Sequence, residues 1–176
     1  MRFTETPLAG AFVIDLERME DPRGFFARTY CQREFAERGL HPKIVQCNVS
    51  WNRTRGTLRG LHYQAAPHEE AKLVSCSKGE VFDVLVDLRP DSKTFRRWFS
   101  IRLSADRANL VYVPEGFAHG FQSLVDDTVV FYQMSEFFRP ELARGIVWND
   151  PSLAIAWPVE NPVVSERDAA LPRISD

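Results

Sequence analysis

Hydrophobic and polar positions alternate in short runs along most of the chain. From residue 44 onward, runs rich in Val, Ile, Phe and Tyr recur at about ten-residue spacing. Gly, Pro, Asp and Ser fill the gaps between them and provide turn geometry. The runs cover residues 44–48, 58–63, 72–76, 81–88, 98–103, 109–113, 121–124 and 128–134. This rhythm predicts an all-β protein, and so many strands favour a double-sheet jelly roll over an immunoglobulin-like sandwich.

The flanking segments predict fewer regular elements. Residues 11–16 fit another strand, and residues 30–39 fit a short helix with Thr29 as its cap and Gly39 as its stop. Four prolines divide the tail after residue 150 into loops and short turns. Neither a repeat nor a linker interrupts the pattern, so we expect one domain over residues 1–176 with short peripheral helices.

The clearest alternation lies in residues 81–87. Period 2 places Phe82, Val84 and Val86 on one face of the strand, and Asp83 and Asp87 on the other face. The pattern predicts that the all-apolar face points into the sandwich.

The composition excludes several classes of protein. With 44% hydrophobic and 26% charged residues, the chain is neither disordered nor collagen-like nor a coiled coil. No apolar run approaches the roughly 20 residues of a membrane-spanning helix, so we expect no membrane partner. The net charge of −2 provides no field that would attract nucleic acid.

The N-terminus and the cysteines indicate the compartment. Residues 1–7 lack the apolar segment of a secretory signal, and the three cysteines are odd in number and widely spaced. We therefore expect a cytoplasmic chain with three free, buried thiols.

Two of the four histidines lie where chemistry is possible. His62 shares one strand face with Gly60 and Gln64, which is too polar for a core face; it could line a cavity in which Gly60 leaves room for a ligand. His119 ends a Pro-x-Gly-x-x-His element at residues 114–119, which resembles the second motif of the cupin jelly rolls. Spacing alone leaves a purely structural role open for both histidines.

A cupin metal site also requires a His-x-His pair and a Glu in the first motif. Position 64 is Gln, so the pair is broken and we expect neither a metal nor another cofactor. Without a metal, general acid–base chemistry is the sharper interpretation of His62 and His119.

Several motifs together resemble the dTDP-4-dehydrorhamnose 3,5-epimerase family. They cover almost the whole chain in order, and coincident motifs of this number are specific to the family. They are DPRGFF at 21–26, QCNVS at 46–50, LRGLHYQ at 58–64, KLV at 72–74, GEVFDV at 79–84, PEGFAHGF at 114–121, WNDP at 148–151 and SERD at 165–168. The resemblance implies a cupin jelly roll, a double-stranded β-helix.

The resemblance also implies roles for five residues around a sugar ketone. His62 matches the general base and Asp168 its buried partner, while Tyr132 matches the acid that returns a proton from the opposite face. Lys72 and His119 match polar residues around the keto oxygen. These types suit the chemistry, because a C–H bond beside a ketone is acidic only when the charge that develops on oxygen is stabilised.

Other positions match contacts to a nucleotide-sugar substrate. Arg59, Gln46 and Asn48 match residues that contact the pyrophosphate and the sugar. Arg23 matches a residue on an N-terminal arm that closes over the nucleotide of the partner subunit. The resemblance therefore implies a homodimer that needs no cofactor.

Two positions depart from the family's pattern. Arg28 stands where a Glu is common, and residues 137–138 are Phe-Phe where an aromatic pair containing Tyr is common. Phe138 keeps a ring for stacking on a base but loses a hydroxyl. An Arg has no acceptor for the N3–H of thymine, so Arg28 suits a cytidine or guanosine nucleotide better, unless it points to solvent or to a phosphate.

The expected function is epimerisation at C3 and C5 of a nucleoside-diphosphate 4-keto-6-deoxyhexose, with dTDP-4-dehydro-6-deoxyglucose as the first candidate substrate. Three alternatives stay open. One is a single-site C5 or C3 epimerase of a CDP- or GDP-linked 4-keto sugar, and another is a ketoisomerase of the same fold. The third is a carbohydrate-binding jelly roll without catalysis.

Overall fold

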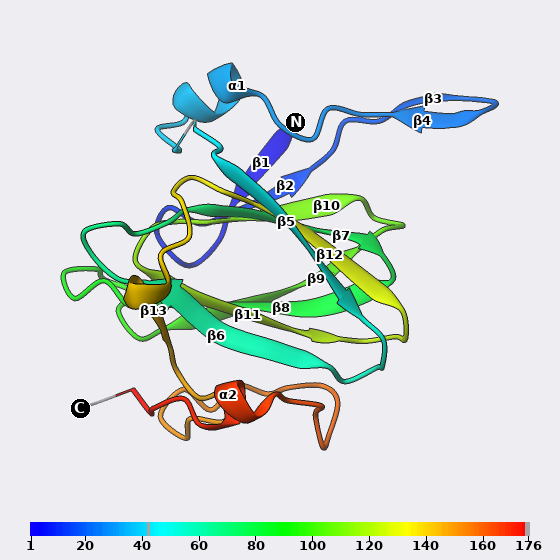
Figure 1. The fold of residues 1–176 in the computed structure, drawn as a ribbon. Coiled ribbons are helices and arrows are strands. Elements are labelled where there is room, and N and C mark those ends of the chain that lie inside the picture. The colour runs from blue at the N-terminus through cyan, green and yellow to red at the C-terminus, as the bar shows by residue number, and fades with distance from the viewer. Residues whose placement is uncertain (42, 175–176) are drawn as a thin grey trace.

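Two antiparallel sheets face each other in the computed structural model, which describes residues 1–41 and 43–174 (Figure 1). One sheet contains, in spatial order, β1 (Arg2–Glu5), β2 (Phe12–Asp15), β10 (Asn109–Val113), β7 (Lys72–Lys78), β12 (Thr128–Met134) and β5 (Gln46–Asn52). The other contains β13 (Ala143–Gly145), β6 (Leu58–Gln64), β11 (Phe117–Ser123), β8 (Glu80–Asp87) and β9 (Trp98–Ser104). The predicted double-sheet architecture is confirmed.

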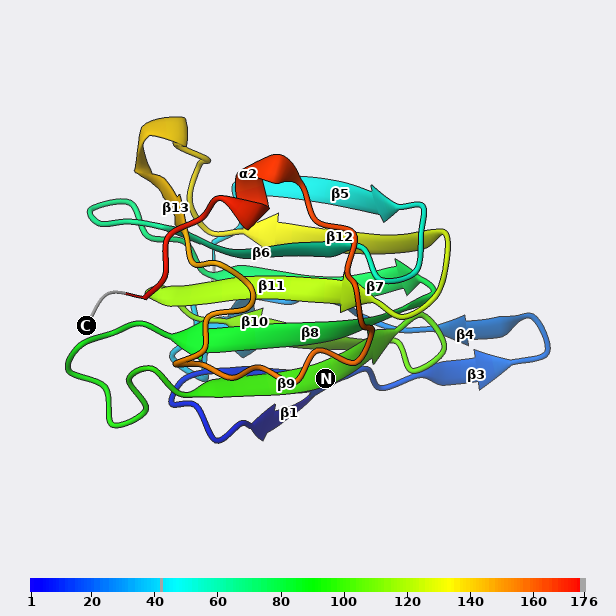
Figure 2. The same cartoon turned by 90° about the horizontal axis from the view of Figure 1, so that it is seen from below.

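The remaining elements lie at the periphery. β3 (Met19–Asp21) and β4 (Gly24–Phe26) form a hairpin that projects away from the two sheets (Figure 1). The helices are α1 (Gln32–Ala36), the 3₁₀ turn η1 (Pro140–Leu142) and α2 (Glu166–Ala169), and the last of these lies beside β6 (Figures 1 and 2). None of the described helices is long and apolar enough to cross a membrane.

Most strands lie where the pattern predicts them, with two notable shifts. The predicted strands at 109–113 and 128–134 match β10 and β12. β11 begins at Phe117, although the pattern predicts a strand only from Phe121, because pairing with β8 along its whole length overrides the weak strand signal of the small residues at 118 and 120. β5 covers residues 46–52 rather than 44–48.

The predicted helix at residues 30–39 is shorter in the structure, and its cap differs. α1 is preceded by Cys31, whose side chain makes no capping hydrogen bond, so the prediction that Thr29 is the cap is wrong. Phe35 instead holds this helix, because its ring is buried against the outer face of β2 and β10. Gly39 has a φ of +68°, the left-handed conformation expected of the residue that stops a helix.

The orientation predicted for β8 is wrong. Val81 and Leu85 belong to the core cluster between the two sheets, so the face that carries Asp83 and Asp87 points inward. The all-apolar face, with Val84 and Val86, points outward and is buried by residues of the tail.

The prediction assumed that one face of this strand is exposed to solvent. The tail covers that face, so the assumption fails. Ile146, Leu153 and Trp157 cover the outside of the five-stranded sheet, so both faces of β8 are buried. The inward carboxylates are tolerated because each has partners: Asp83 bonds to His119, and Asp87 accepts hydrogen bonds from side chains of the 89–94 loop.

All three cysteines are free thiols, but they differ in burial. Cys76 is buried and Cys31 is half-buried. Cys47 is exposed, which corrects the expectation of three buried thiols. Its side chain lies on the outer face of β5, the strand at the edge of the six-stranded sheet.

Candidate active site

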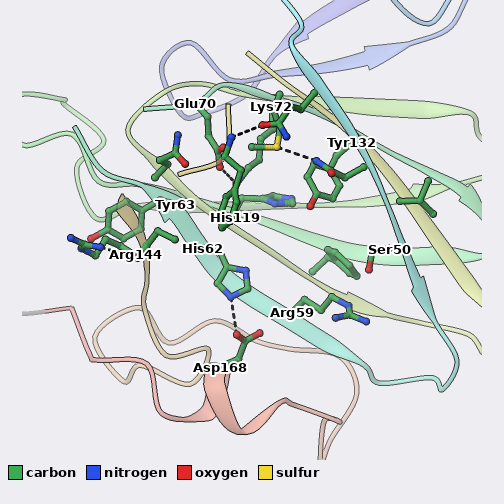
Figure 3. Close-up of a pocket in the computed structure, with 18 of the residues that line it drawn as sticks. Ser50, Arg59, His62, Tyr63, Glu70, Lys72, His119, Tyr132, Arg144 and Asp168 are labelled. Carbon is green, nitrogen blue, oxygen red and sulfur yellow. Dashed lines mark hydrogen bonds and ion pairs between the residues drawn. The ribbon is translucent and has the colours of Figure 1, made fainter. Parts of the chain in front are cut away.

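A cavity of about 660 Å³ lies between the two sheets, and strands of both sheets line it (Figure 3). On the five-stranded sheet His62 of β6 pairs with His119 of β11. On the facing sheet Lys72 of β7 is opposite Met134 in β12, two residues beyond Tyr132. Period 2 turns these side chains to the inside of the sandwich, so basic and acidic groups from distant parts of the chain meet in one cavity.

His62 and Asp168 form a hydrogen-bonded pair at the cavity wall, drawn as a dashed line in Figure 3. The distance from His62 Nε2 to Asp168 Oδ1 is 2.8 Å, and Asp168 Oδ2 accepts a hydrogen bond from the Gly60 N–H at 3.1 Å. Ser165 caps α2 by accepting a hydrogen bond from the Asp168 N–H at 3.1 Å. These contacts hold a carboxylate that is far from His62 in sequence directly against the imidazole.

This pair sets the state of the imidazole. Burial lowers the pKa of His62 from its ordinary value of 6.5, and the hydrogen bond and charge of Asp168 oppose that effect. The ring is therefore neutral at neutral pH. With Nε2–H assigned as the donor to Asp168, Nδ1 carries the lone pair that a general base needs.

Tyr132 lies across the cavity from His62, on the other sheet (Figure 3). Burial raises the pKa of its phenol above 10, the negative charge of Glu70 adds to the effect, and Arg59 opposes it. The phenol therefore stays protonated at neutral pH and can donate a proton.

Two further pairs of basic and acidic side chains lie at the cavity wall. The Lys72 ammonium is 2.7 Å from Glu70 Oε1, and His119 Nε2 lies within 3.0 Å of both oxygens of Asp83. Lys72 thus presents an ammonium to the cavity, whereas His119 can donate from Nδ1 only when both ring nitrogens are protonated, because Nε2–H faces Asp83. Groups of this kind stabilise negative charge that develops on an oxygen.

Four of the predicted substrate-binding residues also line this cavity: Gln46, Asn48, Arg59 and Phe138. Arg59 donates from Nε to Asn52 Oδ1 at 2.8 Å, which orients its guanidinium along the cavity wall. Gln46 Oε1 accepts a hydrogen bond from the Phe138 N–H and so ties the loop that carries Phe138 to β5.

Arg23 and Arg28 lie outside the cavity of their own chain. Arg23 is in the turn of the β3–β4 hairpin, where it pairs with Asp21. Arg28 Nη1 is 3.5 Å from Glu34 Oε1. The described chain therefore does not bring either arginine to the residues around His62.

Sequence reasoning missed other charged residues of the cavity, among them Glu70, Arg144 and Arg167. Two of these residues could have been identified from their positions in the sequence. Glu70 precedes Lys72 by two positions, the spacing that places side chains on one strand face, and Arg167 adjoins Asp168. Arg144 had no local signal, because only the pairing of β13 with β6 places it opposite Tyr63.

The sequence suggested that Gly60 leaves room for a ligand, but the structure shows that it does not. A Cβ at this position would lie 2.6 Å from the Gly120 Cα and 2.9 Å from the His119 carbonyl oxygen. Gly60 is required because β6 and β11 approach each other closely here, beside the two histidines.

Gln64 occupies the place of a metal-binding histidine, but its side-chain amide forms hydrogen bonds with backbone groups. Nε2 donates to the carbonyl oxygens of His68 and Phe137, and Oε1 accepts a hydrogen bond from the Arg139 N–H at 2.8 Å. Within residues 1–41 and 43–174 there is no group of three or more His, Cys, Asp or Glu side chains that could hold a metal ion.

A carboxylate-bound imidazole on one wall of a cavity and a buried phenol on the other provide a base and an acid, as an enzyme that moves protons requires. The comparisons with known proteins agree with this class. The sequence profile of the dTDP-4-dehydrorhamnose 3,5-epimerase family matches residues 5–176. The chain belongs to this family, and its predicted cupin jelly-roll fold is confirmed.

Individual relatives match over nearly the full length. The dTDP-4-dehydrorhamnose 3,5-epimerase of Methanothermobacter thermautotrophicus is 44% identical, over 95% of this chain and 91% of that protein. The crystal structure of the epimerase from Elizabethkingia anophelis has a TM-score of 0.95 at 40% identity, over 98% of this chain and 96% of that one. The Bacillus anthracis enzyme, solved with TDP and PPi bound, has a TM-score of 0.95 at 41% identity, over 98% and 99% of the chains.

Proposed function

We propose that this chain epimerises C3 and C5 of a thymidine-diphosphate-linked 4-keto-6-deoxyhexose, with dTDP-4-dehydro-6-deoxyglucose as substrate. The observation that carries the proposal is the placement of His62 and Tyr132 on opposite walls of one cavity. Inversion needs two groups, because a base that returned its proton to the same face would restore the starting stereocentre.

The first step is removal of a proton beside the C4 ketone. His62 Nδ1 takes the proton from carbon, the C–H electron pair moves toward the C4 oxygen, and an enolate and an imidazolium result. Asp168 stabilises the imidazolium through the 2.8 Å bond to Nε2. Lys72 and His119 face the enolate oxygen, where their positive or donating groups stabilise its charge.

The second step returns a proton to the opposite face of the same carbon. Tyr132 donates it from the facing sheet, the enolate collapses to the ketone with inverted configuration, and a phenolate remains. Exchange of His62 and Tyr132 with solvent resets the site. C3 and C5 both lie beside C4, so the same base and acid serve both carbons after the ring turns in the cavity.

Substrate binding uses the polar groups at the cavity wall. Arg59 has a guanidinium suited to a pyrophosphate, and Gln46 and Asn48 offer amides to the phosphates and the sugar. TDP in the Bacillus anthracis structure supports thymidine diphosphate as the carrier. Arg28 lies against Glu34 and outside the cavity of its own chain, so it could contact a nucleobase only in a partner subunit.

We also propose a homodimer in which the β3–β4 hairpin reaches the partner's site. The hairpin extends away from its own sheets and exposes Phe25 and Phe26, and β5 exposes Val49 and Trp51 at the cavity edge. Exposed apolar groups of this extent are typical of an interface. Arg23, in the turn of the hairpin, would then approach a nucleotide in the partner subunit.

The deciding experiment is incubation with dTDP-4-dehydro-6-deoxyglucose in D₂O, with deuterium at C3 and C5 read by NMR. Label at both carbons with inverted configuration is expected. Label at one carbon only would indicate a single-site epimerase, and no label would indicate a binding protein. His62→Ala should lower the rate by about 10²–10⁴-fold while TDP still binds, and near-normal turnover would reassign the base.

A further inference from the structure

Glu70 is the most buried ion-pair partner in the cavity that the proposed mechanism leaves without a role. Its Oε1 lies 2.7 Å from Lys72 Nζ, and the two side chains are 7% and 10% exposed. Its Oε2 is buried and has no hydrogen-bond partner among the described residues. Burying a carboxylate with one unpaired oxygen costs free energy, so Glu70 does little to stabilise the fold. This points to a role in the site.

The backbone beside Glu70 is fixed to the strand that carries Tyr132. The Ala71 N–H donates to Ser135 Oγ at 2.8 Å, and the Ser135 N–H donates to the Ala71 carbonyl oxygen at 3.0 Å. Ser135 directly follows β12. The backbone next to Glu70 is therefore fixed to the strand of Tyr132, and the carboxylate itself is tied to Lys72.

Other charged groups face these two side chains from the surrounding strands. Asp83 of β8 and His62 of β6 interact electrostatically with Lys72, and His119 of β11 is bonded to Asp83. Tyr132 faces the negative charge of Glu70 and the positive charge of Arg59. Glu70 is thus the one acidic group among these that acts on both Lys72 and Tyr132.

We propose that Glu70 is a positioning residue: its carboxylate fixes the Lys72 ammonium beside the keto oxygen, next to the strand that carries Tyr132. The inference rests on the proposed function. An ammonium on a flexible four-carbon stem needs such an anchor, because a second carboxylate, Asp83, attracts it from another strand. A negative charge beside the phenol opposes formation of the phenolate.

The first test needs no substrate. The phenol of Tyr132 is titrated by absorbance in the wild type and in Glu70→Gln, and the signal of the other tyrosines is subtracted with Tyr132→Phe. The phenol should ionise at lower pH in Glu70→Gln, because burial still raises its pKa but the added effect of the carboxylate is lost. Glu69→Gln, next in sequence but outside the cavity lining, should leave the titration unchanged. An unchanged titration in Glu70→Gln would show that the Glu70 carboxylate does not act on the Tyr132 phenol, and it would contradict the proposed position of that carboxylate.

The second test separates position from charge. Glu70→Ala should lower kcat by about 10²-fold, the scale of a misplacement of roughly 1 Å, with little change in KM or in TDP binding. Glu70→Gln should recover most of that loss, because its amide oxygen can accept the same hydrogen bond from Lys72. A loss confined to KM, or a loss in Glu70→Ala that Glu70→Gln does not recover, would overturn the anchoring role.

The two tests also separate this inference from the proposed function. If the wild type exchanges no hydrogen at C3 or C5, the proposed function fails, and the anchoring role fails with it, while the phenol titration still decides the effect of Glu70 on Tyr132. Thermal unfolding of each variant shows whether it folds. Glu70→Gln keeps the volume of the side chain, so it is the variant on which the tests depend.

Discussion

Two histidine–carboxylate pairs lie side by side on the five-stranded sheet, and their surroundings differ. His62 and His119 face each other in the register of β6 and β11. The His62 side chain is 41% exposed, and its partner Asp168 comes from a helix in the tail outside the sheet. The His119 side chain is 10% exposed, and its partner Asp83, at 0%, comes from the adjacent strand β8.

The difference shows which pair has a ring nitrogen placed to take up a proton and which pair is held in place by its carboxylate. His62 keeps Nδ1 free at an open part of the cavity, and the burial that lowers its pKa leaves it neutral. Asp83 binds His119 Nε2 with both oxygens, and the carboxylate itself is fully buried, which raises the pKa of Asp83. The His62–Asp168 pair is therefore suited to act as a base, whereas the His119–Asp83 pair is a fixed part of the cavity wall.

The largest expected effect is the loss of the Asp168 charge. Asp168→Asn should lower kcat by about 10⁴-fold, the loss found when the corresponding carboxylate of a serine-protease triad is neutralised. The reason is that the amide neither fixes the same tautomer of His62 nor stabilises the imidazolium. Steady-state kinetics with a TDP-binding control measures it. A loss below tenfold would show that Asp168 does not support the base.

The next expected effect is on the stability of the protein rather than on the rate of the reaction. Asp83→Ala should lower the free energy of unfolding by about 3 kcal/mol, because it leaves His119 without its partner in the interior. Asp168→Ala should cost less, because water reaches the His62 ring. Denaturant unfolding of both variants compares the pairs directly. Equal losses would contradict the division into a sealed pair and an open pair.

The pH dependence tests the state of His62. Its pKa is lowered in the folded protein, so the neutral base is populated above that pKa and is lost as the pH falls through it. We expect kcat/KM to be level near pH 7 and to fall by about tenfold for each pH unit in a range below 6.5. A midpoint above 6.5 would show that the Asp168 charge outweighs burial.

The smallest effect concerns the helix that carries Asp168. Ser165→Ala removes the cap of α2, which should cost about 1 kcal/mol of stability and lower kcat modestly, because Asp168 loses the hydrogen bond to its N–H. Unfolding and kinetics on one preparation measure both. A rate loss as large as that of Asp168→Asn would show that the cap, rather than the contact with Gly60, places the carboxylate.

Much of the fold could be predicted from local pattern, since strand length and turns depend on neighbouring residues. The strands of His62 and Tyr132 were predicted in this way, and both residues line the cavity. The orientation of β8 could not be predicted, because the tail covers the face that the pattern assigned to the interior. Glu70 was missed, because a charge just before a strand reads as an exposed one until a second sheet buries it.

The sequence by itself determined an all-β chain with its turns, and its motifs determined the family. Only the tertiary structure decided which side chains share the cavity. Asp168 reaches His62 because the tail folds across the outside of the sheet, and Tyr132 faces His62 because the two strands belong to opposite sheets. The physical reason is that strand periodicity is a local property, whereas the contact between residues far apart in the chain depends on how whole sheets pack and what covers them.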